Sequence, residues 1–104
     1  MLDLSRNELA SVANGAFDNI PRLKSLHLAH NRLSSYKSDY FANMGDGSEA
    51  DLHTLDMSHN ELTYLYPKSF AYHASLRKVD FSHNKFSFFP TQVCLLFSQL
   101  FVYF

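Results

Sequence analysis

The chain has 104 residues, about the size of one domain, with a formal net charge of −1 and a pI near 6.6. This charge balance excludes the strongly basic footprint of most nucleic-acid-binding proteins. Ten Phe, six Tyr and a hydrophobic fraction of 46% supply enough apolar material for a core, which excludes global disorder. The single cysteine, Cys94, excludes an internal disulfide and a multi-cysteine zinc site.

Four similar segments recur along the chain. They are LDLSRNEL (2–9), LHLAHNRL (26–33), LDMSHNEL (55–62) and VDFSHNKF (79–86). Their asparagines are spaced 24, 29 and 24 residues apart, and lie at Asn7, Asn31, Asn60 and Asn84. Apolar residues keep the same register between the segments, including the phenylalanines ten positions after the first three asparagines, Phe17, Phe41 and Phe70. A fixed period over most of a chain indicates a stacked repeat solenoid.

Each segment alternates apolar and polar residues, as a short half-buried strand does. In the third segment and the residue before it, Leu55 and Met57 are expected to point inward, while Thr54, Asp56 and Ser58 point to the opposite face. Successive coils would place these strands side by side in a parallel sheet, about 4.8 Å apart.

The asparagine and phenylalanine positions are predicted to be structural. A turning chain buries backbone amides that need partners, and Asn carries a donor and an acceptor on one short side chain. Stacked phenylalanines would fill the wide side of each coil, each contributing roughly 1.5–3 kcal/mol. Asn60→Ala should therefore destabilise the array much more than His59→Ala.

The pattern L-x-x-L-x-L-x-x-N-x-L, followed by seven variable residues and Phe, resembles the typical 24-residue leucine-rich repeat of animal cell-surface proteins. Within that group, LDMSHNEL and the aromatic-rich spacer LTYLYPKSF are most similar to chaoptin, a photoreceptor adhesion protein, and to Toll-type receptor ectodomains. The resemblance implies an α/β-type repeat solenoid, with a short parallel sheet on its concave face and loops or short helical turns on its convex side. It also implies a protein-recognition module that acts in cell adhesion or as part of a receptor ectodomain.

Residues 1–100 are expected to form one array of about four coils. The five extra residues of the second coil place an insertion near 45–50, where Gly45, Asp46, Gly47 and Ser48 favour a loop. The apolar tail VCLLFSQLFVYF (93–104) is too short to cross a membrane as a helix, since about 20 residues are needed. Its residues up to Leu100 fit the repeat register, whereas 101–104 are a surplus apolar end that could mark a truncated anchor.

The concave face is where solenoids usually bind partners. The strand alternation places small and mixed-charge side chains there, and the binding candidates are Ser25, His27, Thr54, Asp56, Lys78 and Asp80. Asp3, Ser5, Ala29, Ser58 and Ser82 should lie on the same face. The predicted partner is a protein ligand or a second copy of the chain. The alternative is that these residues form an ordinary solvated sheet face.

Two constellations could carry chemistry. His30, His59 and His83 should share one column, which could bind a metal or sense pH, although His is also a common residue at this turn. Asp56 and Asp80 should be neighbours, but an open sheet offers no pocket for acid–base catalysis. Cys94 replaces a core Phe and reads as buried rather than nucleophilic. We therefore predict no enzyme activity, no catalytic residue, no cofactor and no metal.

The location is open to two interpretations. Surface members of the group carry cysteine-rich caps, which this chain lacks, and its N-terminus does not read as a signal peptide. An internal piece of a longer surface protein, attached to a membrane through parts outside this chain, accounts for both observations. A cytoplasmic scaffold, for which a single reduced cysteine is ordinary, is the alternative. A piece of about four coils should fold only marginally when isolated.

Overall fold

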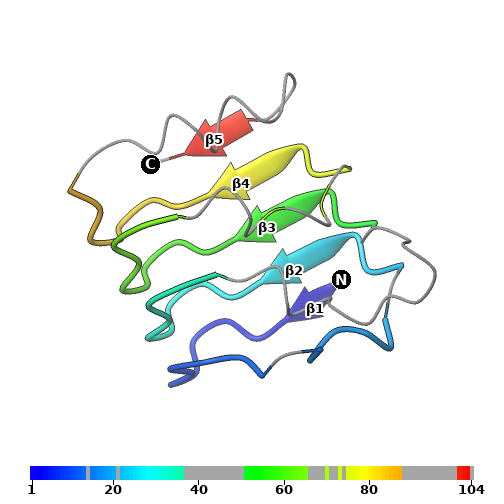
Figure 1. Cartoon of the computed structure of the whole chain (residues 1–104), viewed down its shortest axis with the longest axis horizontal. Helices are drawn as coiled ribbons and strands as arrows, with labels where there is room; N and C mark the ends of the chain where they lie inside the picture. Colours follow the sequence, from blue (N-terminus) through cyan, green and yellow to red (C-terminus); the bar gives the residue numbers. More distant parts are fainter. Residues whose placement is uncertain are drawn as a thin grey trace.

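A computed structural model of the chain shows one parallel sheet whose strands run side by side in sequence order (Figure 1). The structure describes residues 1–13, 15–20, 22–36, 51–65, 70, 73, 75–87 and 101–103. The strands are β1 (Leu2–Asp3), β2 (Ser25–His27), β3 (Thr54–Asp56), β4 (Lys78–Asp80) and β5 (Phe101–Tyr103). The first and last strands lie at opposite edges of the sheet, as expected for a solenoid that adds one strand per coil. Each coil is named below by the strand that begins it.

The strand register aligns equivalent repeat positions. One inward-facing apolar row runs from β1 to β5, because its members are successive partners across the sheet: Leu2, Leu26, Leu55, Val79 and Val102. Leu26, Leu55 and Val79 are completely buried. Because side chains alternate along a strand, the residues on either side of this row point to the other face of the sheet. The expected solenoid with a parallel sheet is confirmed.

The core lies between the sheet and the returning part of each coil. It is built from the apolar repeat positions, among them Leu28, Leu33, Leu52 and Leu62, each with no exposed surface. Full burial of one such side chain contributes roughly 1.5–3 kcal/mol. Since a strand of three residues cannot persist alone, the stacked apolar rows hold the sheet together.

The return of the β1 coil is made of tight turns rather than a regular helix. Ala16, Asp18, Ile20 and Leu23 each donate a backbone hydrogen bond to the residue three positions earlier, at 3.1–3.2 Å. Gly15 has a positive φ of 70°, which glycine adopts without a steric penalty. These turns match the short helical turns expected on the convex side.

The fifth strand lies in a part of the tail that the repeat pattern left unexplained. Val102 pairs with Val79, and Tyr103 pairs with Asp80, so the sheet continues beyond Leu100. The predicted insertion at 45–50, Phe41 and Cys94 lie outside the described residues. Within the described part of the chain, no helix is both long and apolar enough to cross a membrane.

Candidate functional site

The six predicted binding residues lie on one face of the sheet, termed the exposed sheet face. It consists of Ser25 and His27 from β2, Thr54 and Asp56 from β3, and Lys78 and Asp80 from β4. Lys78 is exposed and the other five are half-buried. The register forms two lateral rows, Ser25–Thr54–Lys78 and His27–Asp56–Asp80. The sheet therefore presents a polar surface on which Lys78 is the most exposed of these six side chains.

The aspartates of this face are held by the serines two residues later. Asp56 Oδ1 accepts hydrogen bonds from the Ser58 backbone N–H at 3.0 Å and from the Ser58 hydroxyl at 2.7 Å. Asp80 repeats this arrangement with Ser82, at 2.9 Å and 2.6 Å. One oxygen of each carboxylate is thus engaged by its own coil. The β1 coil has the same motif, because the Ser5 N–H donates to Asp3 Oδ1 at 2.9 Å.

The remaining charges on the exposed sheet face are weakly coupled. His27 Nδ1 lies 3.9 Å from Asp56 Oδ2, and both side chains remain about 30% exposed. Lys78 Nζ lies 5.5 Å from the centre of the Tyr103 ring, within cation–π range. The hydrogen bonds of Ser5 lower the pKa of Asp3 below its usual 3.8. The face therefore combines acidic, basic and aromatic groups, which suits contact with a polar protein surface.

Two residues expected on this face are covered instead. Ala29 is only 5% exposed and Ser58 only 6%. Ser58 turns its hydroxyl back to Asp56, and the Ser58 carbonyl accepts the His30 backbone N–H at 3.0 Å. The hydroxyl bond places Ser58 on the same face as Asp56, as strand alternation predicts, although Ser58 itself is covered. Ala29 and Ser58 were expected on this face, and their small exposed fractions mean that they add little open surface to it.

The predicted asparagine positions lie at the turn after each strand and form a ladder of hydrogen bonds between coils. In the β3 coil, the Asn60 side-chain amide donates to the Leu28 carbonyl of the preceding coil at 2.9 Å. It also donates to the carbonyls of Met57 and Ser58, at 3.1 and 3.2 Å. Asn60 Oδ1 accepts the Leu33 backbone N–H of the preceding coil at 3.0 Å. Both functional groups of the side chain therefore bridge two coils.

Asn31 and Asn84 make the same contacts. Leu9 N–H donates to Asn31 Oδ1 at 3.1 Å, and Leu62 N–H donates to Asn84 Oδ1 at 3.0 Å. In the described part of the chain, Asn7 bonds only within its own coil, to the carbonyls of Leu4 at 3.0 Å and Ser5 at 3.2 Å. The ladder thus positions the turn beside the exposed sheet face.

The phenylalanine positions that can be assessed are in the core. Phe17 is 5% and Phe70 is 4% exposed. Phe70 stacks on Tyr36, with ring centres 5.5 Å apart, and contacts Phe81 edge to face at 6.1 Å. The rings therefore pack with the core of neighbouring coils.

A buried polar pair escaped the sequence interpretation. The Tyr36 hydroxyl lies 2.6 Å from His73 Nε2, and both residues are at most 1% exposed. Tyr36 lies five residues after Asn31, where the β1 and β3 coils have Val12 and Leu65, whereas His73 lies outside the repeat motif. The signal available in the sequence was a polar residue, His73, among apolar neighbours. That signal did not identify Tyr36 as its partner.

The three histidines that were expected to share one column do so at the turns after the strands. His30, His59 and His83 have stacked rings at successive separations of 4.1 Å. Among the described residues, no group of three His, Cys, Asp or Glu side chains is arranged to hold a metal ion. Face-to-face rings do not converge their nitrogens on a common point.

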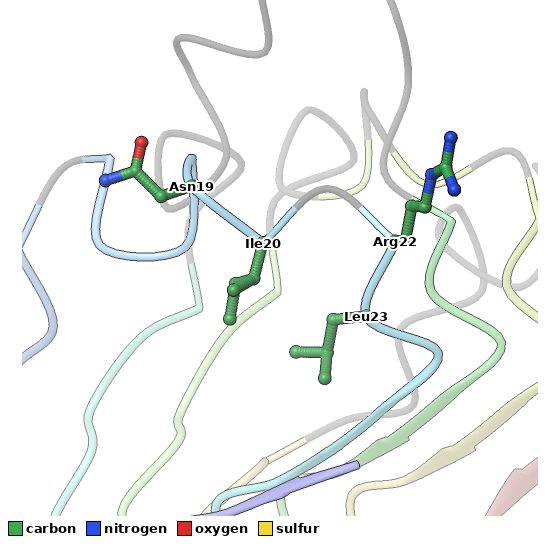
Figure 2. A pocket seen from close by; sticks show the side chains of 4 residues that line it. All are labelled: Asn19, Ile20, Arg22 and Leu23. Carbon is green, nitrogen blue, oxygen red and sulfur yellow. The ribbon is translucent and has the colours of Figure 1, made fainter.

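A shallow hollow lies on the returning part of the β1 coil. It encloses about 410 Å³ and is lined by Asn19, Ile20, Arg22 and Leu23. Figure 2 shows Ile20 and Leu23 pointing to the same side, while Asn19 and Arg22 point away from them. Ile20 remains 40% exposed. The hollow is apolar and open, and it holds no acid–base or nucleophilic group.

Comparison with known proteins agrees with this architecture. Two family models described as leucine-rich repeats match residues 1–46 and residues 51–72 and 75–96, together most of the chain. Leucine-rich repeat-containing protein 3 of Danio rerio is 34% identical over 70 residues, which cover 67% of this chain and 25% of that protein. Leucine-rich repeats and immunoglobulin-like domains protein 1 of Homo sapiens is 37% identical over 70 residues, which cover 67% of this chain and 6% of that protein.

The aligned part of the chain thus spans a quarter or less of the length of these relatives. The family commonly serves as a protein-interaction module and builds a parallel sheet from repeated strands. The asparagine ladder, the buried apolar rows and the matched family models agree, and the chain belongs to the leucine-rich repeat family.

Proposed function

We propose that the chain is a protein-recognition module of a cell-surface protein, and that it binds its partner through the exposed sheet face. The observation that carries this proposal is the continuous polar surface made by the rows Ser25–Thr54–Lys78 and His27–Asp56–Asp80. Its backbone is fixed by strand pairing and by the turn ladder. A surface held in this way loses little conformational entropy when a partner binds.

The chemistry of the face favours recognition over catalysis. Asp56 and Asp80 are paired in register, but each gives one oxygen to a serine hydroxyl of its own coil. The face is a flat sheet surface and not a cleft that could exclude water from a reacting group. A broad surface with mixed charge can instead match a complementary protein surface.

Adhesion or ligand capture outside the cell is the finer part of the proposal. The resemblance to chaoptin and to Toll-type ectodomains supports it. The human relative is named for leucine-rich repeats and immunoglobulin-like domains, and domains of the latter architecture are frequent at cell surfaces. The partner is then a protein on a neighbouring cell or a second copy of the same chain.

The binding face can be tested with a matched pair of substitutions in the β3 coil. Thr54 lies on the exposed sheet face, and Thr63 is exposed beyond the turn. Beads coated with the full chain should cluster if recognition is homophilic, and the soluble chain should bind to intact cultured animal cells if it is heterophilic. Thr54→Arg should abolish whichever signal is present, whereas Thr63→Arg should retain it. Equal effects of the two substitutions would refute the assignment of the face.

The cytoplasmic scaffold is the rival proposal, and it predicts a different location. An antibody against this chain should stain intact cells that express the complete gene product if the module is extracellular. Staining that requires permeabilised cells would favour the scaffold. This measurement is independent of which face of the sheet binds the partner.

A further inference from the structure

Three histidine rings form a continuous stack along the corner of the β2, β3 and β4 coils. The ring planes of His30 and His59 are inclined by 11°, and those of His59 and His83 by 10°, with both centre-to-centre distances 4.1 Å. All three residues have a left-handed backbone, with φ between 55° and 57°. His is among the non-glycine residues enriched in this conformation. The repeated backbone therefore sets the positions of the three rings, which we term the histidine column.

The position of the column couples it to the packing of neighbouring coils. The His30 N–H donates to the Ser58 carbonyl at 3.0 Å, and the His59 N–H donates to the Ser82 carbonyl at 2.9 Å. The rings of His30 and His59 are therefore attached to backbone segments that bond the next coil. A force that separates the rings acts directly on these inter-coil contacts.

The groups around His59, the central ring, shift its pKa in opposite directions. Desolvation lowers the pKa of His59 below its usual 6.5, and charge on His30 and His83 lowers it further, while Asp80 and Asp56 oppose this shift. The charged residues that directly follow the asparagines are paired with each other. Arg32 lies 3.9 Å from Glu8, and Lys85 lies 3.4 Å from Glu61. Arg6 occupies the equivalent left-handed position in the β1 coil, with φ of 59°.

We propose that the histidine column is an acid-sensitive element of the array, in which neutral rings stack and protonated neighbours weaken the contacts between the β2, β3 and β4 coils. Neutral imidazoles can stay in contact at 4.1 Å without charge repulsion. Protonation of two adjacent rings places like charges at that separation. The central ring has a like ring on both sides, so it is the position at which uptake of a proton is most strongly opposed. This property is independent of the proposed ligand.

The sign of the effect follows from proton linkage. In the unfolded chain a histidine takes up a proton near pH 6.5, whereas the folded array keeps His59 neutral to lower pH. The unfolded state therefore binds more protons as the solution is acidified below this value, which favours unfolding. The stabilising contribution of the neutral column is complete above that pH and is lost below it.

Unfolding by urea at about pH 7.5 and at about pH 5 tests the proposal. His59→Asn keeps a side chain that tolerates the left-handed backbone and removes the central titrating ring. The wild-type chain should lose more stability on acidification than His59→Asn. The control is His53→Asn, because His53 lies outside the column and is paired with Asp51 at 3.8 Å. This control should behave like the wild type, and buried His73 contributes equally to all three chains.

Proton NMR of the imidazole groups provides the second measurement. In the double variant His30→Asn/His83→Asn, the titration midpoint of His59 should rise, because both like neighbours are gone. A merely structural role would leave that midpoint unchanged. An unchanged midpoint would overturn the proposal, as would equal acid sensitivity of His59→Asn and the wild type. If His59→Asn fails to fold, the NMR midpoint decides.

Discussion

The β1 coil and the β3 coil have nearly the same motif and the same turn, yet they differ in what their residues contribute. Both turns contain a left-handed residue, Arg6 with φ of 59° and His59 with φ of 55°. Asn7 is exposed and bonds only its own coil in the described part of the chain, whereas Asn60 is 6% exposed and bonds two coils. The repeat motif is therefore sufficient to specify the backbone. The stabilisation from each residue depends on whether coils pack on both sides.

The same contrast holds for the apolar row. Leu2 on β1 is half-buried, whereas Leu55 on β3 has no exposed surface. β1 pairs only with β2 in the described sheet, while β3 lies between β2 and β4. Stability in such an array is a sum of coil and interface terms, so an edge coil should open before a central one.

The largest difference between the two coils is expected for leucine substitutions. Leu55→Ala leaves a cavity among buried neighbours and should cost about 3 kcal/mol, enough to unfold a marginal array. Leu2→Ala should cost about 1 kcal/mol, because its side chain is already partly in water. Urea unfolding followed by circular dichroism measures both. Equal losses would mean that burial does not distinguish the coils.

The asparagine ladder should give the next largest difference. Asn60→Ala leaves the buried Leu33 N–H of the preceding coil without its partner, and an unpaired buried group costs about 1–3 kcal/mol. It also removes one of two side-chain bonds to the Leu28 carbonyl, which keeps its bond from Asn31. Asn7→Ala removes two exposed bonds and should cost less than about 1 kcal/mol. Amide hydrogen exchange at Leu33 should accelerate strongly in the first variant. His59→Ala serves as the control within the β3 turn and should cost much less than Asn60→Ala.

The sheet and its exposed face could be predicted from the sequence, because both depend on the short period of the repeat. The spacing of Asn31, Asn60 and Asn84 and the alternation around Leu55 indicated the sheet and its exposed face. The position of Val102 was harder to predict, because several neighbouring apolar residues could each satisfy the inward position of a fifth strand. Pairing of Val102 with Val79 resolves that ambiguity.

The buried Tyr36–His73 bond shows where periodicity stops being informative. The two residues are 37 positions apart, and the bond forms only because successive coils bring them together. The covered Ser58 is a second example. Strand alternation correctly places it on the same face as Asp56 but does not indicate that only 6% of it is exposed. Both features depend on side-chain geometry that a repeat pattern does not encode.

The smallest effects on stability are expected for the exposed residues that directly follow the asparagines. At these positions, substitutions in the β1 and β3 coils should have equal effects. Glu8 Oε1 lies 3.9 Å from Arg32 Nη2, and Glu61 Oε1 lies 3.4 Å from Lys85 Nζ. All four side chains are at least 47% exposed. Surface pairs of this kind typically contribute about 0–1 kcal/mol. Glu8→Gln and Glu61→Gln should therefore each change the free energy of unfolding by less than about 0.5 kcal/mol.

The equality of these two variants is the informative result. If Glu61→Gln were far more costly than Glu8→Gln, the β3 coil would be more sensitive to every substitution, whatever its burial. Suppose instead that the two glutamate variants have equally small effects, while Leu55→Ala costs more than Leu2→Ala. The difference in stability between the coils then arises from desolvation of side chains. The edge and the centre of the array would then differ only where a neighbouring coil removes water from the side chain.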